Sequence, residues 1–215
     1  FRARGLHLDD RHLRHADGRP FSASIADATL YVVANHARLT ADGSSIVLYL
    51  PKIQTAEEAA FWNEILVALE SHVGLAAGSI KVYVLVEQLE ATFQLMEIRA
   101  ALSTRFVGFN TGRWDYINSV SDALAWDRAF VNPNIESITM PYGYMRAYED
   151  RVRRAVNTAD VEGRHALWQG GMEPNIPVGS ERGVSAGMKR AVAGGEREQR
   201  AGASGKWVAH WKMVH

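Results

Sequence analysis

The chain has 215 residues, a formal net charge of zero, and 47% hydrophobic against 22% charged residues. This composition is ordinary for a globular protein and excludes disordered and fibrous classes. The 24 Lys and Arg residues are balanced by 24 Asp and Glu, so no basic excess predicts a nucleic-acid partner. Cysteine is absent, which excludes disulfides and cysteine nucleophiles and fits a reducing compartment, so we expect a cytoplasmic location. No apolar run approaches the ~18 residues of a membrane span, so we expect no membrane partner.

Short apolar runs alternate with amphipathic segments along the chain. In chain order we predict a strand at 28–34, a strand at 46–50, a helix from a Thr55 cap to about Leu69, a strand at 80–86, a helix at 90–103, a strand at 106–109, a strand at 137–140, a helix at 141–152, a strand at 166–169 broken by Gly170-Gly171, a helix at 183–200 and a strand at 207–211. Strands that alternate with helices imply parallel pairing with the helices outside.

Seven such strands fit most of a (β/α)8 barrel. We therefore predict an α/β fold, a TIM barrel that is incomplete at both ends, forming a single domain over residues 1–215. The chain opens on Phe1 rather than on an initiator Met, and it closes on an apolar run. We expect it to be a fragment, or the visible part of a longer protein.

Polar residues that directly follow the strands are the candidates for chemistry, because active sites of these barrels lie at the carboxyl ends of the strands. Glu87 follows the strand at 80–86, and Asp115 lies about one βα unit further on. Two converging carboxylates suit Mg²⁺, which binds one or two carboxylates together with water and substrate oxygens. The ordinary alternative is that each carboxylate is a solvated loop residue or a helix cap, and spacing alone favours that alternative.

Basic residues near strand ends have two interpretations as well. Lys52, after the strand at 46–50, is as readily structural as functional, and an arginine such as Arg2 or Arg4 more often forms a surface ion pair. The histidines near the start lack metal-ligand spacing, and we expect them in surface loops: His7, His12 and His15.

Several short motifs then point to one family. They are RARGLHL at 2–8, LPK at 50–52, VLVE at 84–87, FNTGRWDYI at 109–117, MRAY at 145–148, GGM at 170–172 and KWVAH at 206–210. Together they resemble the malate synthases, which condense glyoxylate with acetyl-CoA. The resemblance covers nearly the whole chain, and its most specific part is NTGRWDYI.

The resemblance implies a TIM barrel with flanking domains and a Mg²⁺ ion bound by a Glu and an Asp. These two ligands match Glu87 and Asp115, the residues that strand ends had already suggested. It also implies that backbone amides around Gly112, Arg113 and Trp114 hold the carboxylate of glyoxylate. Because glyoxylate chelates the Mg²⁺, Glu87 and Asp115 belong to the implied glyoxylate site as well.

The family's catalytic arginine matches Arg2, with Arg4 the poorer match; Arg2 would stabilise the enolate of acetyl-CoA and contact glyoxylate. Trp211 stands where the family usually has a proline near the bound CoA, which leaves this acetyl-CoA contact open. The resemblance places the catalytic base, an Asp, in a domain beyond His215, so neither that C-terminal domain nor the family's N-terminal region is expected here. We therefore expect the isolated chain to be inactive, with Glu173 the nearest substitute for the base.

Two other functions remain open. A related Mg²⁺-dependent barrel lyase of the citryl-CoA or malyl-CoA type would also use two carboxylates at strand ends, although GRWDYI favours the synthase. A non-catalytic barrel module would keep the fold alone, and the presence of Arg2, Glu87 and Asp115 argues against it.

Overall fold

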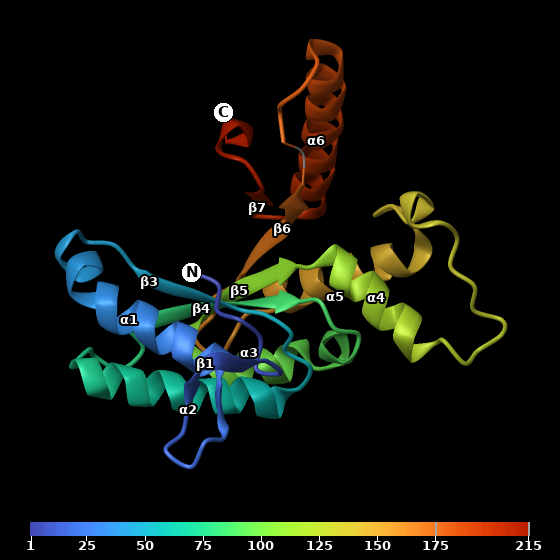
Figure 1. Ribbon diagram of the computed structural model, residues 1–215. Coiled ribbons are helices and arrows are strands. Elements are labelled where there is room, and N and C mark those ends of the chain that lie inside the picture. Colours follow the sequence, from blue (N-terminus) through green and yellow to red (C-terminus); the bar gives the residue numbers. More distant parts are fainter. Residues whose placement is uncertain (175, 215) are drawn as a thin grey trace. The chain divides into compact units, whose positions relative to one another are not determined.

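The computed structural model describes residues 1–174 and 176–214, and the chain forms two compact units, Phe1–Val107 and Gly108–His215 (Figure 1). In each unit parallel strands alternate with helices along the chain, as the apolar pattern predicts. Within the described residues, no helix combines the length and the apolar character that crossing a membrane requires.

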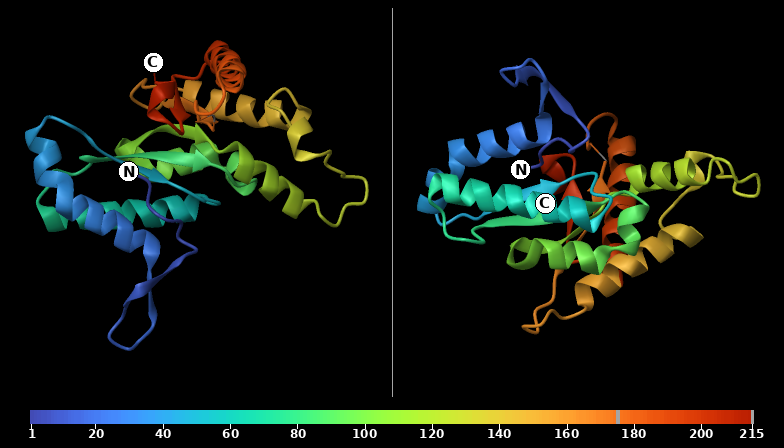
Figure 2. Two further views of the ribbon diagram at one scale, coloured as in Figure 1. Left: turned by 45° about the horizontal axis from the view of Figure 1, so that its top comes forward. Right: turned by 90° about the horizontal axis from the view of Figure 1, so that it is seen from below.

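The first unit starts with a small antiparallel hairpin and continues as a repeat of strands and helices. Its elements are β1 (Asp9–Arg14), β2 (Pro20–Ser22), α1 (Ala23–Ala41), β3 (Ile46–Leu50), α2 (Ala56–Val73), β4 (Ile80–Val86), η1 (Glu90–Phe93), α3 (Leu95–Leu102) and η2 (Ser103–Arg105). The parallel pair β3–β4 is in register from Ile46 opposite Ile80 to Leu50 opposite Val84. In Figure 2 the hairpin projects from this unit, while α1 and α2 run along one side of the strands.

The two strands and the helix α2 confirm the sequence prediction closely. β3 and β4 have the predicted bounds, and β4 is buried along nearly its whole length, as a parallel strand covered by helices should be. The Thr55 hydroxyl accepts a hydrogen bond from the N–H of Glu58 at 3.3 Å and caps α2. The helix ends at Gly74, whose φ of 73° suits glycine.

The predicted strand at 28–34 is wrong, because these residues belong to the helix α1. The hydroxyl of Ser22 caps this helix by accepting from the N–H of Ile25. Three of its buried residues, Ser24, Ala28 and Val32, recur every four positions, while Leu30 and Val33 on the same apolar run are exposed. A short apolar run does not separate a strand from a helix, and here the cap and the burial period decide for the helix.

The second unit repeats the alternation of strands and helices. Its elements are β5 (Phe106–Thr111, most of which belongs here), α4 (Arg113–Ala123), η3 (Ile135–Ser137), α5 (Gly143–Asn157), β6 (Leu167–Glu173), α6 (Glu181–Ala201), β7 (Gly205–Val208) and η4 (Trp211–Met213). β6 pairs in parallel with β5 and with β7. Gly108 of β5 lies opposite Leu167, which sets the register of the first pair.

Three predicted strands in this unit need correction. β6 does not break at Gly170-Gly171 but continues to Glu173. Neighbouring groups leave little room for a side chain at either glycine, which explains why glycine stands at both positions. The segment 137–140 forms no strand. The 3-10 helix η3 ends at Ser137, and the side chains of Ile138 and Met140 beyond it are each buried. The last strand starts earlier than predicted and ends at Val208, and Trp211 begins the turn η4.

Candidate active site

Glu87 lies directly after β4, and its side chain is only 2% exposed. One of its carboxylate oxygens, Oε1, accepts a hydrogen bond of 2.7 Å from the main-chain N–H of Lys52. The other oxygen, Oε2, lies 3.9 Å from the Lys52 ammonium. A buried carboxylate must be compensated by donors or cations, and oxygen donors of this kind are the ligands of hard divalent ions.

Lys52 donates the hydrogen bond to Glu87 from an unusual main-chain conformation. It follows β3 and Pro51, and its φ is 61°, a left-handed conformation that residues other than glycine rarely adopt. Such a conformation costs of order 1–3 kcal/mol and persists where the surroundings fix it, often at functional sites. The main chain at Lys52 is therefore shaped to present its N–H to Glu87.

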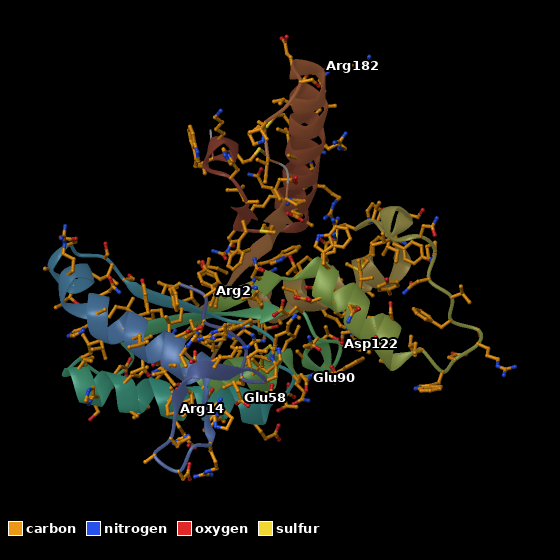
Figure 3. All side chains as sticks on the ribbon, in the orientation of Figure 1. Arg2, Arg14, Glu58, Glu90, Asp122 and Arg182 are labelled. Carbon is orange, nitrogen blue, oxygen red and sulfur yellow. The ribbon has the colours of Figure 1, made fainter. Side chains whose placement is uncertain are left out.

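The segment before β1 lies beside the same strand ends. Arg2 forms a parallel bridge with Tyr49 of β3, and its side chain is exposed (Figure 3). A Cβ atom on Gly5 would meet the His7 ring at 2.6 Å and the Lys52 side chain at 3.3 Å. The structure thus gathers Arg2, Lys52 and Glu87 at the carboxyl ends of β3 and β4 and of the segment that pairs with β3.

Arg4 differs sharply from Arg2. Its guanidinium forms ion pairs of 2.8 Å with both Asp10 and Asp27. These contacts use the donors that a substrate carboxylate or enolate would need, which agrees with Arg2 as the better match to a catalytic arginine.

In the second unit, the predicted glyoxylate-binding residues form the start of a helix. Gly112 follows β5 and precedes α4, whose first three residues are Arg113, Trp114 and Asp115. The first N–H groups of a helix have no partner within the helix and carry partial positive charge, so they suit an anion such as a carboxylate. The first turn is formed here, as the N–H of Tyr116 donates to the Gly112 carbonyl at 3.1 Å.

The side chains of this turn are ordered by packing and charge. The Arg113 guanidinium lies 4.2 Å from the centre of the Trp114 ring, which is the geometry of a cation–π contact. Burial lowers the pKa of Arg113, and the carboxylates of Glu198 and Glu173 oppose that shift. Asp115 is partly buried at the third position of the helix.

The remaining predicted residues also lie in the second unit. Glu173 is the last residue of β6 and is partly buried. Trp211 is 66% exposed in η4 and has the Lys212 ammonium 5.6 Å from its ring centre. Glu87 belongs to the first unit and Asp115 to the second, and their joint use stays a prediction. Among the described residues there is no group of three or more metal-binding side chains, but a Mg²⁺ site needs only one or two carboxylates.

The sequence alone did not predict the roles of three residues near this site. It gave no role to Asp10 or Asp27, and it left Lys52 undecided. Asp27 carried no signal, because it preceded a segment expected to be a strand. The positive φ of Lys52 could not be anticipated from the residue type, although its place after Pro51 at a strand end was a hint.

The fold and the placement of polar groups after parallel strands define a domain of the TIM-barrel class. Solved structures agree. The malate synthase of Haloferax volcanii in a lead(II) complex superposes with a TM-score of 0.62 at 14% identity, and the match covers 99% of this chain and 51% of the Haloferax chain. A citrate lyase from Burkholderia xenovorans LB400 superposes with a TM-score of 0.56 at 17% identity, over 94% of this chain and 65% of its own. At such identities the likeness concerns the fold.

Comparison of sequences gives the family. Residues 1–215 match the family model of the malate synthase TIM barrel domain. The chain is 40% identical over 214 residues to a bifunctional glyoxylate cycle protein of Caenorhabditis elegans and 36% identical to the malate synthases of Myxococcus xanthus and, over 209 residues, Escherichia coli K12. The matches extend over 97–99% of this chain but over only 22%, 38% and 38% of the three relatives, in the same order. The chain belongs to the malate synthase TIM barrel family and spans well under half the length of these curated relatives.

Proposed function

We propose that this chain carries the glyoxylate-binding and metal-binding part of a malate synthase. The observation that carries the proposal is the match of the family model to all 215 residues. The buried carboxylate of Glu87 at the end of β4 and the helix start at Gly112 supply the two kinds of group that the reaction requires.

Glu87 and Asp115 would hold a Mg²⁺ ion. The donor chemistry fits, since both are carboxylates and Glu87 already lies among a main-chain N–H and an ammonium rather than beside soft ligands. When bound, Mg²⁺ polarises the aldehyde of glyoxylate and offsets the negative charge that develops on its oxygen.

The chain's own groups would bind and orient the substrates. The N–H groups of Gly112, Arg113 and Trp114 would hold the glyoxylate carboxylate at the start of α4. Arg2, which stays charged at any working pH, would stabilise the negative oxygen of the acetyl-CoA enolate and contact glyoxylate. Trp211 offers an exposed indole for a contact with acetyl-CoA.

The reaction also needs a base that is none of these residues. This carboxylate base would take a methyl proton from the acetyl group, the enolate carbon would form a bond to the aldehyde carbon of glyoxylate, and the aldehyde oxygen would take up a proton. Water then cleaves the thioester, which releases malate and CoA. Arg2 would stay protonated and the carboxylates of Glu87 and Asp115 would be engaged as metal ligands, so none of the three would take the first proton.

The test is an assay of the purified full-length protein with acetyl-CoA, glyoxylate and Mg²⁺. We expect release of the CoA thiol that requires glyoxylate and Mg²⁺, with malate identified by mass spectrometry in equal amount. Cleavage of malyl-CoA to acetyl-CoA and glyoxylate, without net hydrolysis, would instead assign a lyase. The absence of both reactions would indicate a non-catalytic barrel.

A further inference from the structure

The carboxylate of Asp27 holds the main chain and the side chain of Arg4 together. The Arg4 guanidinium donates from Nε to Asp27 Oδ2 and from Nη2 to Asp27 Oδ1, both at 2.8 Å. The main-chain N–H of Arg4 also donates to Asp27 Oδ2 at 3.0 Å. Two parallel bonds between a guanidinium and a carboxylate fix geometry as well as charge, and the third bond adds the backbone to the same anchor.

A second carboxylate closes this cluster from the hairpin side. Asp10 is 8% exposed, and its Oδ2 accepts from Arg4 Nη2 at 2.8 Å. Its Oδ1 accepts from the main-chain N–H groups of His12 and Leu13, each at 2.7 Å. Arg4 is thereby held from two elements at once, α1 and β1, which restricts its main chain more than one surface ion pair would.

The helix α1 also contacts the chain at Phe1, on the N-terminal side of Arg2. Tyr31 lies four residues after Asp27, which places both on one face of α1. The Tyr31 ring stacks on the Phe1 ring with 4.4 Å between centres, and the Phe1 carbonyl accepts from the N–H of Tyr49 at 2.8 Å. Arg2 therefore lies between two fixed points, one residue from the first and two from the second.

We propose that Asp27 is a positioning residue for Arg2, acting through Arg4. The inference rests on the proposed function, in which Arg2 contacts the reacting enolate. Ala3, between the two arginines, is only 2% exposed, so the linking residue is packed as well. An arginine whose main chain is fixed in advance loses less freedom when it meets developing charge, and this is how such donors lower a barrier.

A double-mutant cycle in the full-length protein tests this proposal with Asp27→Asn, Arg2→Lys and the two combined. Arg2→Lys should lower kcat much more than it raises the KM for glyoxylate, because its contact strengthens in the transition state. Asp27→Asn alone should lower kcat by on the order of tenfold to a hundredfold, the size of a small misplacement of a catalytic group. In the Arg2→Lys background the same change should cost less than about twofold, because the group it positions is already altered.

The matched control is Asp42→Asn, which removes an aspartate–arginine pair of 2.7 Å with Arg38 just after the same helix. It should leave kcat unchanged. If Asp27→Asn does not yield folded protein, as judged by circular dichroism, Arg4→Lys replaces it. This change keeps the positive charge but removes the pair of hydrogen bonds from the guanidinium to Asp27, and it should show the same coupling to Arg2→Lys.

The outcomes separate the two levels of the argument. If Arg2→Lys leaves kcat unchanged, the proposed role of Arg2 is wrong and this inference fails with it. If Arg2→Lys lowers kcat but Asp27→Asn or Arg4→Lys does not, or if their effects multiply independently, the positioning role is overturned while the proposed function stands.

Discussion

Asp10 is a nearly buried carboxylate that stays charged because three donors point at it. The main-chain N–H of Leu13, the Arg4 guanidinium and the main-chain N–H of His12 lower the pKa of Asp10 from its ordinary 3.8 to about 2. A carboxylate whose pKa is lower in the folded state stabilises the fold at pH values above its unfolded pKa. That contribution is lost as the pH falls from about 4 toward 2.

We therefore predict that Asp10→Asn lowers the unfolding midpoint of the full-length protein at pH 6 and that the deficit shrinks as the pH falls to 3. Thermal unfolding of both proteins across this range measures the difference. Asp9→Asn, an exposed neighbour in the same strand, is the control and should change the midpoint little at pH 6. A deficit that stays constant from pH 6 to 3 would contradict the role given to the Asp10 charge.

Which site residues could be predicted depended on how locally they are determined. Glu87 was accessible because IKVYVLV marks a buried strand and the next residue must lie at its carboxyl end. The pairing of Arg4 with Asp27 was not, because it joins residues 23 positions apart. Reading 28–34 as a strand would also have placed Asp27 and Tyr31 about 13 Å apart, against about 6 Å along a helix.

At the scale of the elements, β6 shows why glycine can continue a strand. A Cβ atom on Gly170 would clash with Oε2 of Glu198, in α6. Glu198 cannot easily move, because Lys206 of β7 pairs with it at 2.7 Å and it is 5% exposed. Burial raises the pKa of Glu198, and Lys206 opposes that shift by favouring the charged form. The glycine therefore lets a strand, a helix and a partly buried charge pair approach closely.

Gly170→Ala should destabilise the protein by roughly 1–3 kcal/mol, the usual cost of overpacking a tight site. Gly194→Ala is the matched control, since Gly194 lies inside α6 with nothing within 4 Å of its Cβ position. It should stabilise the protein by up to about 1 kcal/mol, because alanine favours helix. Denaturant unfolding of the two variants measures both effects, and equal effects of the same sign would refute the packing argument.

The elements themselves were predicted well where burial and caps agree with the apolar pattern. β3, β4 and α2 have such agreement, and their bounds were close. The two predicted strands that were wrong, at 28–34 and 137–140, contain apolar residues, but the first lies inside a capped helix and the second lies at the end of η3 and just beyond it. The hairpin β1–β2 was missed because it is mostly exposed and polar; Arg14, labelled in Figure 3, is the last residue of β1.

At the scale of the whole molecule, the family was recognisable because its motifs are spread from residue 2 to residue 210. The family model confirms that resemblance over the same residues. Contacts between distant segments, such as Lys52 with Glu87, needed the structure. The single domain over 1–215, the Mg²⁺ ligands and the CoA contact at Trp211 stay predictions.

The most direct test is the Mg²⁺ dependence of glyoxylate-dependent CoA release by the full-length protein and its Glu87→Gln and Asp115→Asn variants. The controls are Glu90→Gln and Asp122→Asn, which change exposed carboxylates three residues after Glu87 and seven residues after Asp115 (Figure 3). We predict that each ligand variant loses on the order of a hundredfold or more in turnover at limiting Mg²⁺, because a charged oxygen ligand is gone, whereas both controls keep wild-type rates. Near wild-type turnover by both ligand variants at limiting Mg²⁺ would contradict the metal site and the account built on it.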